Sequence, residues 1–535
     1  MSDDTTFDYI IVGGGLCGCV LAARIKNSFP HRTVALIETG SDARKSPDIL
    51  SPSRAFALAG TKYHYTNITT PQKHLNYRSI PLATGRTLGG GSAVNYGAWT
   101  RGDKSGYDEW AAMVGDERWT YNRLLPYFKR AETYPLLQDK INHGYRGPIH
   151  LSSGGRGYPL RDHVRDAMLA VGLPFNPDQN CGNPYGVSPL VESWHDGERS
   201  FAANTYDLSG VKLFTDSQVA TIIVRSKKVT GVRLVNNRTL HTRIETIVSC
   251  GAIRTPQLLM LSGIGRPDEL ARLAIPVQVE STEMGRNLHD HPSISLWFPL
   301  RTPEAGLAVG SDKFMANSKY FDGNPMDWFS NAPAPQLEMR NAAKVDGQRS
   351  LREDDIEISC MYVATPTGPH PPPSMDGSLI TLSICGLSTT SRGRVTLTSA
   401  DPDDPPVVDP NYLGTEHDRA VLRAGVRLAL EMMDSAAGKR FAKSELPPSQ
   451  FSPLNSKSSD DALDERIRAC AWTYYHPAGT ASMGTVVDTE CRVKGVEGLR
   501  VVDASVLPVS IGAHLQAVLY GVAERAAEMI VADTR

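Results

Sequence analysis

Short runs of aliphatic and β-branched residues open the chain, separated by glycines and one amphipathic stretch. Residues 8–12 and 33–37 form two such runs, which predicts two buried strands. Between them Leu16, Val20 and Ala23 recur at i, i+4 and i+7, the spacing of one face of a helix. The pattern therefore predicts a strand, a helix and a second strand at the start of the chain.

Segments rich in β-forming residues return in the second half of the chain and predict an antiparallel sheet. They span residues 293–298, 356–360, 379–384 and 394–397. Residues 366–373 and 401–406 are rich in proline and aspartate, which predicts loops. Near the end, residues 499–503 form another buried-strand run, and residues 515–526 show the apolar spacing of a helix.

The first predicted strand leads directly into a glycine cluster with the spacing GxGxxG. Gly13 permits a tight turn, Gly15 lets the main chain approach a pyrophosphate, and Gly18 lets the helix pack closely on the strand. Glu38 ends the second strand, 20 residues beyond Gly18, where a carboxylate would accept a ribose hydroxyl. A glycine cluster alone could be an ordinary turn, but strand, glycines, helix, strand and acid in this order predict a dinucleotide site.

The charge balance excludes several classes of partner. Lys and Arg number 56 against 58 Asp and Glu, a formal net charge of −2, so there is no excess of basic charge to attract nucleic acid or an anionic membrane. No apolar run of about 18 residues occurs. The N-terminus lacks the features of a secretory signal, so we expect a cytoplasmic protein without a membrane anchor.

The eight cysteines form neither CxxC pairs nor a dense scaffold, which predicts free thiols. His289 and His291 have no Cys or carboxylate cluster of ligand spacing around them, so we expect no metal site there. A generic turn explains these two histidines as well as a role near a cofactor does.

Four blocks of the sequence are similar, in order, to the signatures of the glucose-methanol-choline (GMC) flavin oxidoreductases. They are residues 85–102, which contain Gly85-Arg86-Thr87-Leu88-Gly89-Gly90-Gly91, and residues 251–265, 285–291 and 472–480. The resemblance runs from about residue 8 to residue 530. Within the family, the active-site pattern resembles that of the aryl-alcohol oxidases most.

The resemblance implies an FAD cofactor held by main-chain groups and a few polar side chains. Val94 stands where some relatives carry a histidine that tethers the flavin, so we expect non-covalent FAD. The residues expected to bind FAD are Gly13, Gly15, Gly18, Glu38, Arg86, Gly90, Ser92, Asn95, Val219, Asp503 and Ala513.

Two histidines fall inside the matched blocks of the C-terminal region. The resemblance assigns His476 as the base that takes the hydroxyl proton of an alcohol while hydride passes to flavin N5, and an imidazole titrates near neutrality. His514, 38 positions later at the start of the last predicted helix, matches the partner that orients the hydroxyl. That helix start would also stabilise negative charge on a reduced ring.

Tyr475, before His476, and Tyr96, after Asn95, are the expected substrate-binding residues. Core packing is the alternative for each tyrosine. Both match aromatic positions of aryl-alcohol oxidases, which favours an aromatic or conjugated primary or secondary alcohol, oxidised to an aldehyde or ketone. We expect an intermediate of secondary metabolism as substrate. The histidine pair favours O2 as acceptor, although no motif distinguishes O2 from another electron acceptor.

The predicted fold class is α/β, with a Rossmann-like FAD-binding domain and a second α+β substrate domain on an antiparallel sheet. Because the FAD motifs occupy the beginning, middle and end of the chain, the FAD domain must be discontinuous. Its predicted parts are residues 1–150, 211–291 and 461–535, and the substrate domain comprises residues 151–210 and 292–460.

Two other functions remain open for such a chain. One is a redox-neutral flavoprotein of the lyase or photodecarboxylase type, although the resemblance implies that the decarboxylase lacks the histidine pair. The other is a catalytically silent FAD-binding protein.

Overall fold

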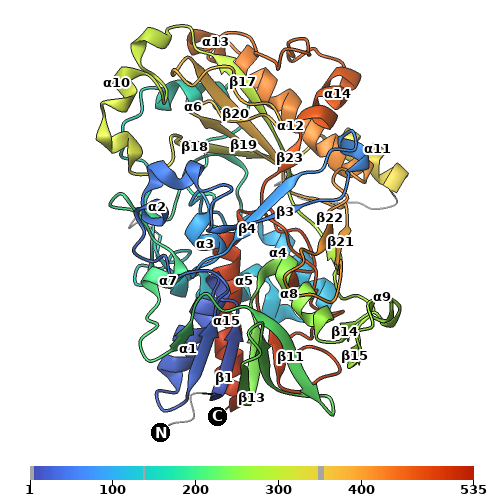
Figure 1. Ribbon diagram of the computed structural model, residues 1–535. Coiled ribbons are helices and arrows are strands. Elements are labelled where there is room, and N and C mark those ends of the chain that lie inside the picture. The colour runs from blue at the N-terminus through green and yellow to red at the C-terminus, as the bar shows by residue number, and fades with distance from the viewer. Residues whose placement is uncertain (1–4, 136–138, 347–354, 535) are drawn as a thin grey trace.

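Two sheets, one above the other, organise the molecule in the computed structural model, which describes residues 5–135, 139–346 and 355–534 (Figure 1). The lower sheet carries β1 and β13 near both chain termini, and the upper sheet carries β17 to β20. The mixed α/β architecture with a separate antiparallel sheet confirms the predicted fold class. The boundaries between the five predicted segments stay a prediction.

The lower sheet, called the main sheet below, combines strands from distant parts of the chain. Its order is β10-β2-β1-β13-β12-β11, and β24 also pairs with β13. The strands are β1 (Thr6–Val12), β2 (Val34–Ile37), β10 (Lys212–Phe214), β11 (Val219–Arg225), β12 (Lys228–Leu234), β13 (Thr239–Val248) and β24 (Leu499–Val501). β1, β2, β13 and β24 run parallel, and β1, β2 and β24 are buried, as the continuous apolar runs predict.

Three helices pack beside this sheet. α1 (Leu16–Ser28) follows the glycine turn and contacts α15 (Leu515–Thr534), which in turn contacts α5 (Tyr121–Ala131). In Figure 1, α15 runs from the middle of the molecule down to the C-terminus. Gly18 allows α1 to lie against β1, because a Cβ there would meet the Gly13 carbonyl oxygen at 2.0 Å. The start of α15 is therefore placed near the centre of the molecule.

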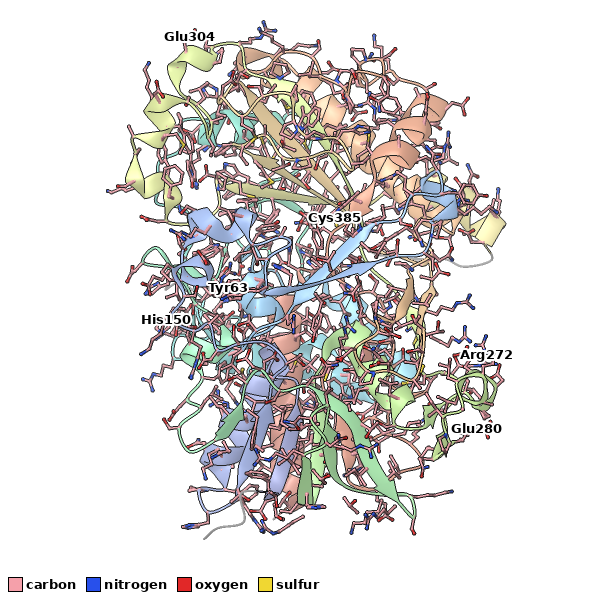
Figure 2. The ribbon with its side chains drawn as sticks, viewed as in Figure 1. Tyr63, His150, Arg272, Glu280, Glu304 and Cys385 are labelled. Atoms are coloured by element: carbon pink, nitrogen blue, oxygen red, sulfur yellow. The ribbon has the colours of Figure 1, made fainter. Side chains whose placement is uncertain are left out.

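The upper sheet, called the cap sheet below, is antiparallel with the order β23-β17-β20-β19-β18-β7. Its strands are β7 (Gly186–Pro189), β17 (Pro292–Pro299), β18 (Trp328–Ala332), β19 (Ile356–Met361), β20 (Leu379–Gly386) and β23 (Trp472–Thr473). α12 (Glu416–Asp434) covers β17, β19 and β20. Figure 2 marks the buried Cys385 on β20 in the interior, whereas Glu304, Arg272 and Glu280 lie at the periphery.

Two predictions of local structure were wrong. Residues 394–397 do not join the cap sheet, because β21 (Gly393–Thr396) pairs with β16 (Arg286–Leu288) and β22 (Val407–Asp409) in a separate sheet. Pro256, which follows a strand-like run at residues 247–252 and is expected from the sequence in the first turn of a helix, lies inside α8 (Gly251–Leu261). The proline leaves the Ala252 carbonyl without its helical donor, and the Thr480 hydroxyl donates to that oxygen at 2.6 Å.

The remaining elements are short or peripheral. The other strands are β3 (His64–Ile68), β4 (Pro81–Gly85), β5 (Glu132–Thr133), β6 (Ile149–His150), β8 (Trp194–His195), β9 (Glu198–Arg199), β14 (Ile264–Gly265) and β15 (Val279–Glu280). The other helices are α2 (Pro47–Leu50), α3 (Gly91–Val94), α4 (Lys104–Val114), α6 (Arg161–Leu169), α7 (Ala202–Thr205), α9 (Pro267–Arg272), α10 (Asp312–Met315), α11 (Gln336–Asp346), α13 (Gly438–Phe441) and α14 (Asp460–Cys470).

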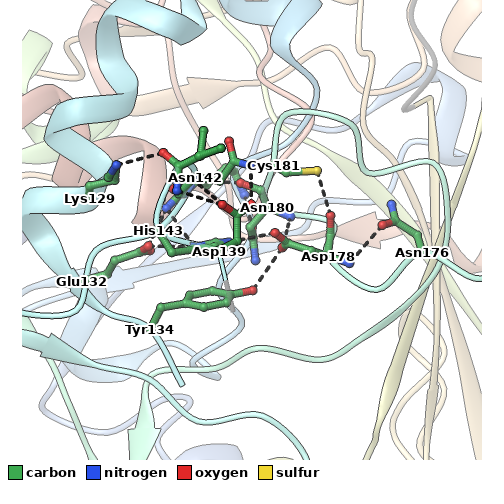
Figure 3. Close-up of polar contacts among 12 residues, drawn as sticks. Lys129, Glu132, Tyr134, Asp139, Asn142, His143, Asn176, Asp178, Asn180 and Cys181 are labelled. Atoms are coloured by element: carbon green, nitrogen blue, oxygen red, sulfur yellow. Dashed lines mark hydrogen bonds and ion pairs between the residues drawn. The ribbon is translucent and has the colours of Figure 1, made fainter. Parts of the chain in front are cut away.

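A buried network of charged groups joins the segment after α5 to the rest of the fold (Figure 3). His143 lies between two carboxylates, with Nδ1 2.9 Å from Glu132 and Nε2 2.8 Å from Asp178. The Arg101 guanidinium donates to the same Glu132 oxygen at 2.6 Å. Since carboxylates only accept, both imidazole nitrogens donate and the ring is an imidazolium. These bonds raise the pKa of His143 against the effect of burial.

We expect His143→Gln to lower the free energy of unfolding by about 1–3 kcal/mol, because buried carboxylate oxygens lose a charged donor. A pKa that is raised in the folded state adds stability fully present below the unfolded value of 6.5. That contribution is lost as pH rises through the folded pKa. The stability gap between the two proteins, measured by urea unfolding, should therefore narrow with rising pH.

His31→Gln is the matched control, because His31 is exposed. A gap for His143→Gln that is absent, or that widens as pH rises, would contradict the imidazolium assignment.

Candidate active site

A cavity of about 1210 Å³ extends from the turn after β1 to the inner side of the cap sheet. Gly13, Gly15 and Glu38 line it on the main-sheet side, and His476 and His514 line it where the two parts meet. Small-molecule sites usually occupy about 300–1,000 Å³. The cavity therefore has room for a dinucleotide together with a further small molecule.

The dinucleotide turn is closely packed around its main chain. Gly13 has φ of 97°, and a Cβ there would lie 2.4 Å from the Ser249 carbonyl oxygen. The Glu38 carboxylate accepts hydrogen bonds from the main-chain amides of Gly14 at 2.9 Å and Gly40 at 2.7 Å. Burial raises the pKa of Glu38 to about 7. A ribose hydroxyl donating to this carboxylate would stabilise its charged form.

The glycine-rich loop after β4 rests against that turn. Gly90 has φ of 52°, and a Cβ there would lie 2.7 Å from the Gly15 Cα, so only glycine fits. A Cβ on Gly91 or Gly251, both on the cavity wall, would have no neighbour within 4 Å. These two positions border open space, where a planar group can approach the main chain. The observation fits the cofactor that the sequence predicts.

Most residues predicted to bind the cofactor lie on the cavity wall. They are Gly13, Gly15, Glu38, Gly90, Ser92, Asn95, Val219 and Asp503. Gly18, Arg86 and Ala513 are not part of the wall. Gly18 serves helix packing, Arg86 lies over the Tyr65 ring at 5.2 Å, and Ala513 is fully buried beside His514.

Ser92 and Asn95 use their side chains within the protein. The Ser92 hydroxyl donates to the Gly89 carbonyl at 2.7 Å. The Asn95 side-chain oxygen accepts from the Arg199 guanidinium at 2.9 Å, and its amide donates to Gln516 at 3.1 Å. These bonds hold the glycine loop in shape.

Asp503 lies at the junction of three segments. Its carboxylate accepts from the Gly251 amide at 2.9 Å, the Thr255 hydroxyl at 2.6 Å and the Ser505 amide at 2.7 Å. The carboxylate therefore caps the start of α8 and still faces the cavity. Burial raises its pKa.

The two predicted histidines lie together, as their ring centroids are 5.1 Å apart and the rings are nearly perpendicular. His514 stands just before α15, with its main-chain amide donating to the Thr100 hydroxyl at 2.7 Å. Its Nε2 is 2.9 Å from the Glu357 carboxylate, which is buried on β19. Burial, followed by the nearby His514 and His291, holds the pKa of His476 well below 6.5. His476 is therefore neutral near pH 7 and able to accept a proton.

Three polar residues around the pair were not assigned a role from the sequence, which left His291 open between a generic turn and a role near the cofactor. Asp290 accepts from the Tyr412 hydroxyl at 2.5 Å, the Thr473 hydroxyl at 2.6 Å and the His476 amide at 2.7 Å, and so fixes the backbone at His476. His291 has its Nδ1 3.0 Å from Nδ1 of His476. The third is Glu357. The sign of its role in the sequence was a carboxylate at a position within the predicted strand 356–360.

The two predicted substrate residues lie at the mouth of the cavity. Tyr96 is 40% exposed and stacks on Phe56 at 4.7 Å, and Tyr475 is 41% exposed and accepts a hydrogen bond from the Trp472 indole at 3.1 Å. Further inside the cavity, the ring centroids of Phe329 and His514 are 5.3 Å apart. The path to the histidines is therefore lined with aromatic rings.

All eight cysteines are free thiols. Within residues 5–135, 139–346 and 355–534, no group of three or more His, Cys, Asp or Glu side chains could hold a metal ion. In the same ranges no helix is long and apolar enough to cross a membrane.

Comparisons with known proteins agree with this geometry. Sequence profiles of the GMC oxidoreductases match residues 7–293 and 389–523. The GMC-type oxidoreductase acuG of Aspergillus aculeatus is 42% identical, over 99% of both chains. An alcohol dehydrogenase [acceptor] of Pseudomonas putida is 32% identical, over 98% of this chain and 96% of its own. The structure of pyridoxine 4-oxidase from Mesorbium loti aligns with a TM-score of 0.86 at 27% identity, over 98% of both chains.

The chain belongs to the GMC oxidoreductase family, whose members bind FAD. The expected family and cofactor are thus confirmed, and the residues on the cavity wall fit that cofactor. Members of the family are oxidoreductases that act on alcohols or similar donors. Attachment of FAD without a covalent bond stays a prediction based on Val94, which lines the cavity.

We expect Glu38→Gln to weaken FAD binding about 10-fold or more, because a hydrogen bond to a charged carboxylate becomes one to a neutral amide. Denaturant should release the flavin completely, which also tests its non-covalent attachment. The dissociation constant of FAD is then measured by quenching of flavin fluorescence as apoprotein is added.

Asp216→Asn is the matched control, because Asp216 is an exposed acid whose charge acts on Glu38 only through space. Equal affinities of the Glu38→Gln variant and the original protein would refute the ribose contact.

Proposed function

We propose that the protein oxidises an uncharged primary or secondary alcohol, aromatic or conjugated, to the aldehyde or ketone. The observation that carries this proposal is the pair of imidazoles at one cavity, His476 with a strongly lowered pKa and His514 bonded to a buried carboxylate. A neutral imidazole is a suitable base for a hydroxyl proton.

FAD, when bound, supplies the acceptor for the hydride that leaves the carbinol carbon. His476 takes the hydroxyl proton, since its ring is neutral and lines the cavity. Glu357 holds the His514 ring in one orientation, so that His514 can bond the substrate oxygen next to the base. The start of α15 at this point adds its positive end to the reacting region.

The charge distribution on the cavity wall supports an uncharged substrate. The acids and arginine on the wall are Glu38, Arg254 and Asp503, which follow β2, lie in α8 and follow β24, all on the main-sheet side. Among the described residues of the cavity wall, those from the cap sheet and its loops carry no formal charge. An ammonium or carboxylate group bound there would lose its hydration without a counter-ion.

The shape and chemistry of the entrance support an aromatic or conjugated substrate. Tyr96, Tyr475, Phe56 and Phe329 provide flat apolar surfaces along the path to the histidines. Pyridoxine, in the name of the similar pyridoxine 4-oxidase, is an alcohol on an aromatic ring. The alcohol dehydrogenase among the relatives supports the reaction type.

An anaerobic panel of alcohols tests this proposal, because only a substrate that is oxidised bleaches the yellow absorbance of the bound flavin. We expect bleaching with neutral aryl or conjugated alcohols, and at least about 10-fold weaker half-saturation for analogues that carry an ammonium or carboxylate group. Admitting air afterwards, with peroxide detection, tests whether O2 is the electron acceptor.

Half-saturation by the charged analogues at the same concentration as by the neutral alcohols would overturn the assigned substrate class. A yellow protein that no alcohol bleaches would favour the redox-neutral or silent alternatives.

We expect His476→Ala to lower the rate of flavin reduction about 10²–10⁴-fold, the range that a general base contributes. The variant should keep its bound FAD, and the rate is measured by stopped-flow absorbance without oxygen. His417→Gln is the matched control, because His417 is a buried histidine that bonds the Ser388 carbonyl and does not line the cavity. A His476→Ala protein that is reduced at the original rate would refute the assigned base.

A further inference from the structure

A chain of hydrogen-bonded groups leads from the Leu387 carbonyl, just after β20 of the cap sheet, to His476. The Ser510 hydroxyl donates to the Leu387 carbonyl at 2.9 Å. His291 Nε2 is 2.9 Å from the same Ser510 oxygen, and His291 Nδ1 is 3.0 Å from His476 Nδ1. His291 and Ser510 are buried and do not line the cavity. Because neither side chain lines the cavity, His291 and Ser510 can affect the reaction only through His476.

The chemistry of these groups fixes the direction of each bond. A carbonyl oxygen only accepts, so the single hydroxyl hydrogen of Ser510 points at Leu387. The Ser510 oxygen must then accept from His291 Nε2–H. In the neutral ring that the proposal assigns to His291, this is the one N–H, so Nδ1 of His291 is an acceptor and Nδ1 of His476 is the donor.

We propose that His291 is a positioning residue that keeps the hydrogen of His476 on Nδ1 and leaves the Nε2 lone pair for the hydroxyl proton of the substrate. The role of that lone pair rests on the proposed function, whereas the position of the hydrogen does not. With the opposite direction, His476 would carry its hydrogen on Nε2 and could accept nothing there. The direction of one hydrogen bond thus decides whether His476 can act.

The same bond supports the protonated form of the base. When the substrate O–H bond breaks, its proton forms a bond with Nε2, and the resulting imidazolium still donates Nδ1–H to His291. A hydrogen bond from a charged donor is stronger than one from a neutral donor. His291 therefore stabilises the state that follows proton transfer more than the state before it, which is a contribution to rate rather than to binding.

Other anchors of His476 do not orient its ring in this way. Asp290 bonds only the main-chain amide of His476. Tyr474 and His514 meet the ring edge to face, with centroids 5.4 Å and 5.1 Å away. Among the described residues, only His291 bonds a ring nitrogen of His476. Tautomer and ring orientation thus depend on this one partner.

A pair of substitutions separates the acceptor role from packing. His291→Leu removes the acceptor, and we expect the anaerobic rate of flavin reduction to fall about 10–100-fold, since the imidazolium loses a hydrogen bond. The dissociation constant of the substrate should stay the same. His291→Asn places a side-chain oxygen near the former Nδ1, so this conservative variant should recover most of the lost rate. His417→Gln controls for the loss of a buried cap histidine.

A direct measurement of the tautomer uses the original protein, labelled with nitrogen-15 in histidine and loaded with FAD. Nitrogen chemical shifts should report Nδ1 of His476 as protonated and Nε2 as unprotonated, with the His476→Ala spectrum assigning the signals. In His291→Leu the pattern should shift toward protonated Nε2. This readout needs no substrate, so it separates the tautomer from the alcohol reaction.

Each outcome decides the proposal. A protonated Nε2 in the original protein overturns it, and so do equal rates of reduction in His291→Leu and His291→Asn. If His291→Leu does not fold with FAD, the tautomer measurement and the His291→Asn rate still decide. If no alcohol is oxidised but the shifts show the Nδ1–H tautomer, the proposed function fails while the positioning role stands.

Discussion

The close approach of two glycine-bearing turns is the constraint on which the rest of the active site depends. The loop after β4 lies so near the turn after β1 that Gly90 faces the Gly15 Cα with no room for a side chain. Gly13 lies against the main chain of Ser249 in the same way. Because side chains are excluded from these contacts, main-chain groups line the dinucleotide end of the cavity. FAD, the cofactor of the family, would therefore face main-chain groups in fixed positions rather than side chains that can change rotamer.

The end of the cavity that holds the histidine pair is built on the opposite principle, with buried polar side chains that fix one another. Asp290 gathers two hydroxyls and the His476 amide, and Glu357 holds His514. Buried polar groups of this kind are costly unless each is satisfied, so the network tolerates few arrangements. The two ends meet at the start of α15, where main-sheet and cap residues share one cavity.

The sequence predicted those parts of the fold that are written in local patterns. The strands on either side of α1, the glycine turn, the histidine pair and three strands of the cap sheet all follow from spacing or from motif blocks. A strand was correctly predicted near residues 394–397, but the pattern of these residues does not show which strands pair with it. Pro256 was misplaced because a threonine 224 positions later, Thr480, satisfies the carbonyl that the proline leaves open.

The missed residues share one property, which is that their roles arise only from convergence in space. Asp290 and the amide that it bonds are 186 positions apart, and His291 and its partner 185. The segment 285–291 has the local composition of a turn, and nothing in its sequence identifies the segment around His476 as its partner. Motif blocks in the sequence therefore point to the two histidines but not to the groups that hold them.

The position of β13 between β1 and β24 has a consequence for biosynthesis. β1 leaves the ribosome first, yet its neighbour β13 ends at residue 248, and β24 follows only at residue 499. Ribosomes add about 5–20 residues per second, so roughly half a minute or more separates the first strand from the last. The edge of β1 is open until β13 has been made, and the edge of β13 that pairs with β24 lacks its partner for the whole interval and is exposed to aggregation. The nascent chain must be protected until α15 has been synthesised and packs on α1.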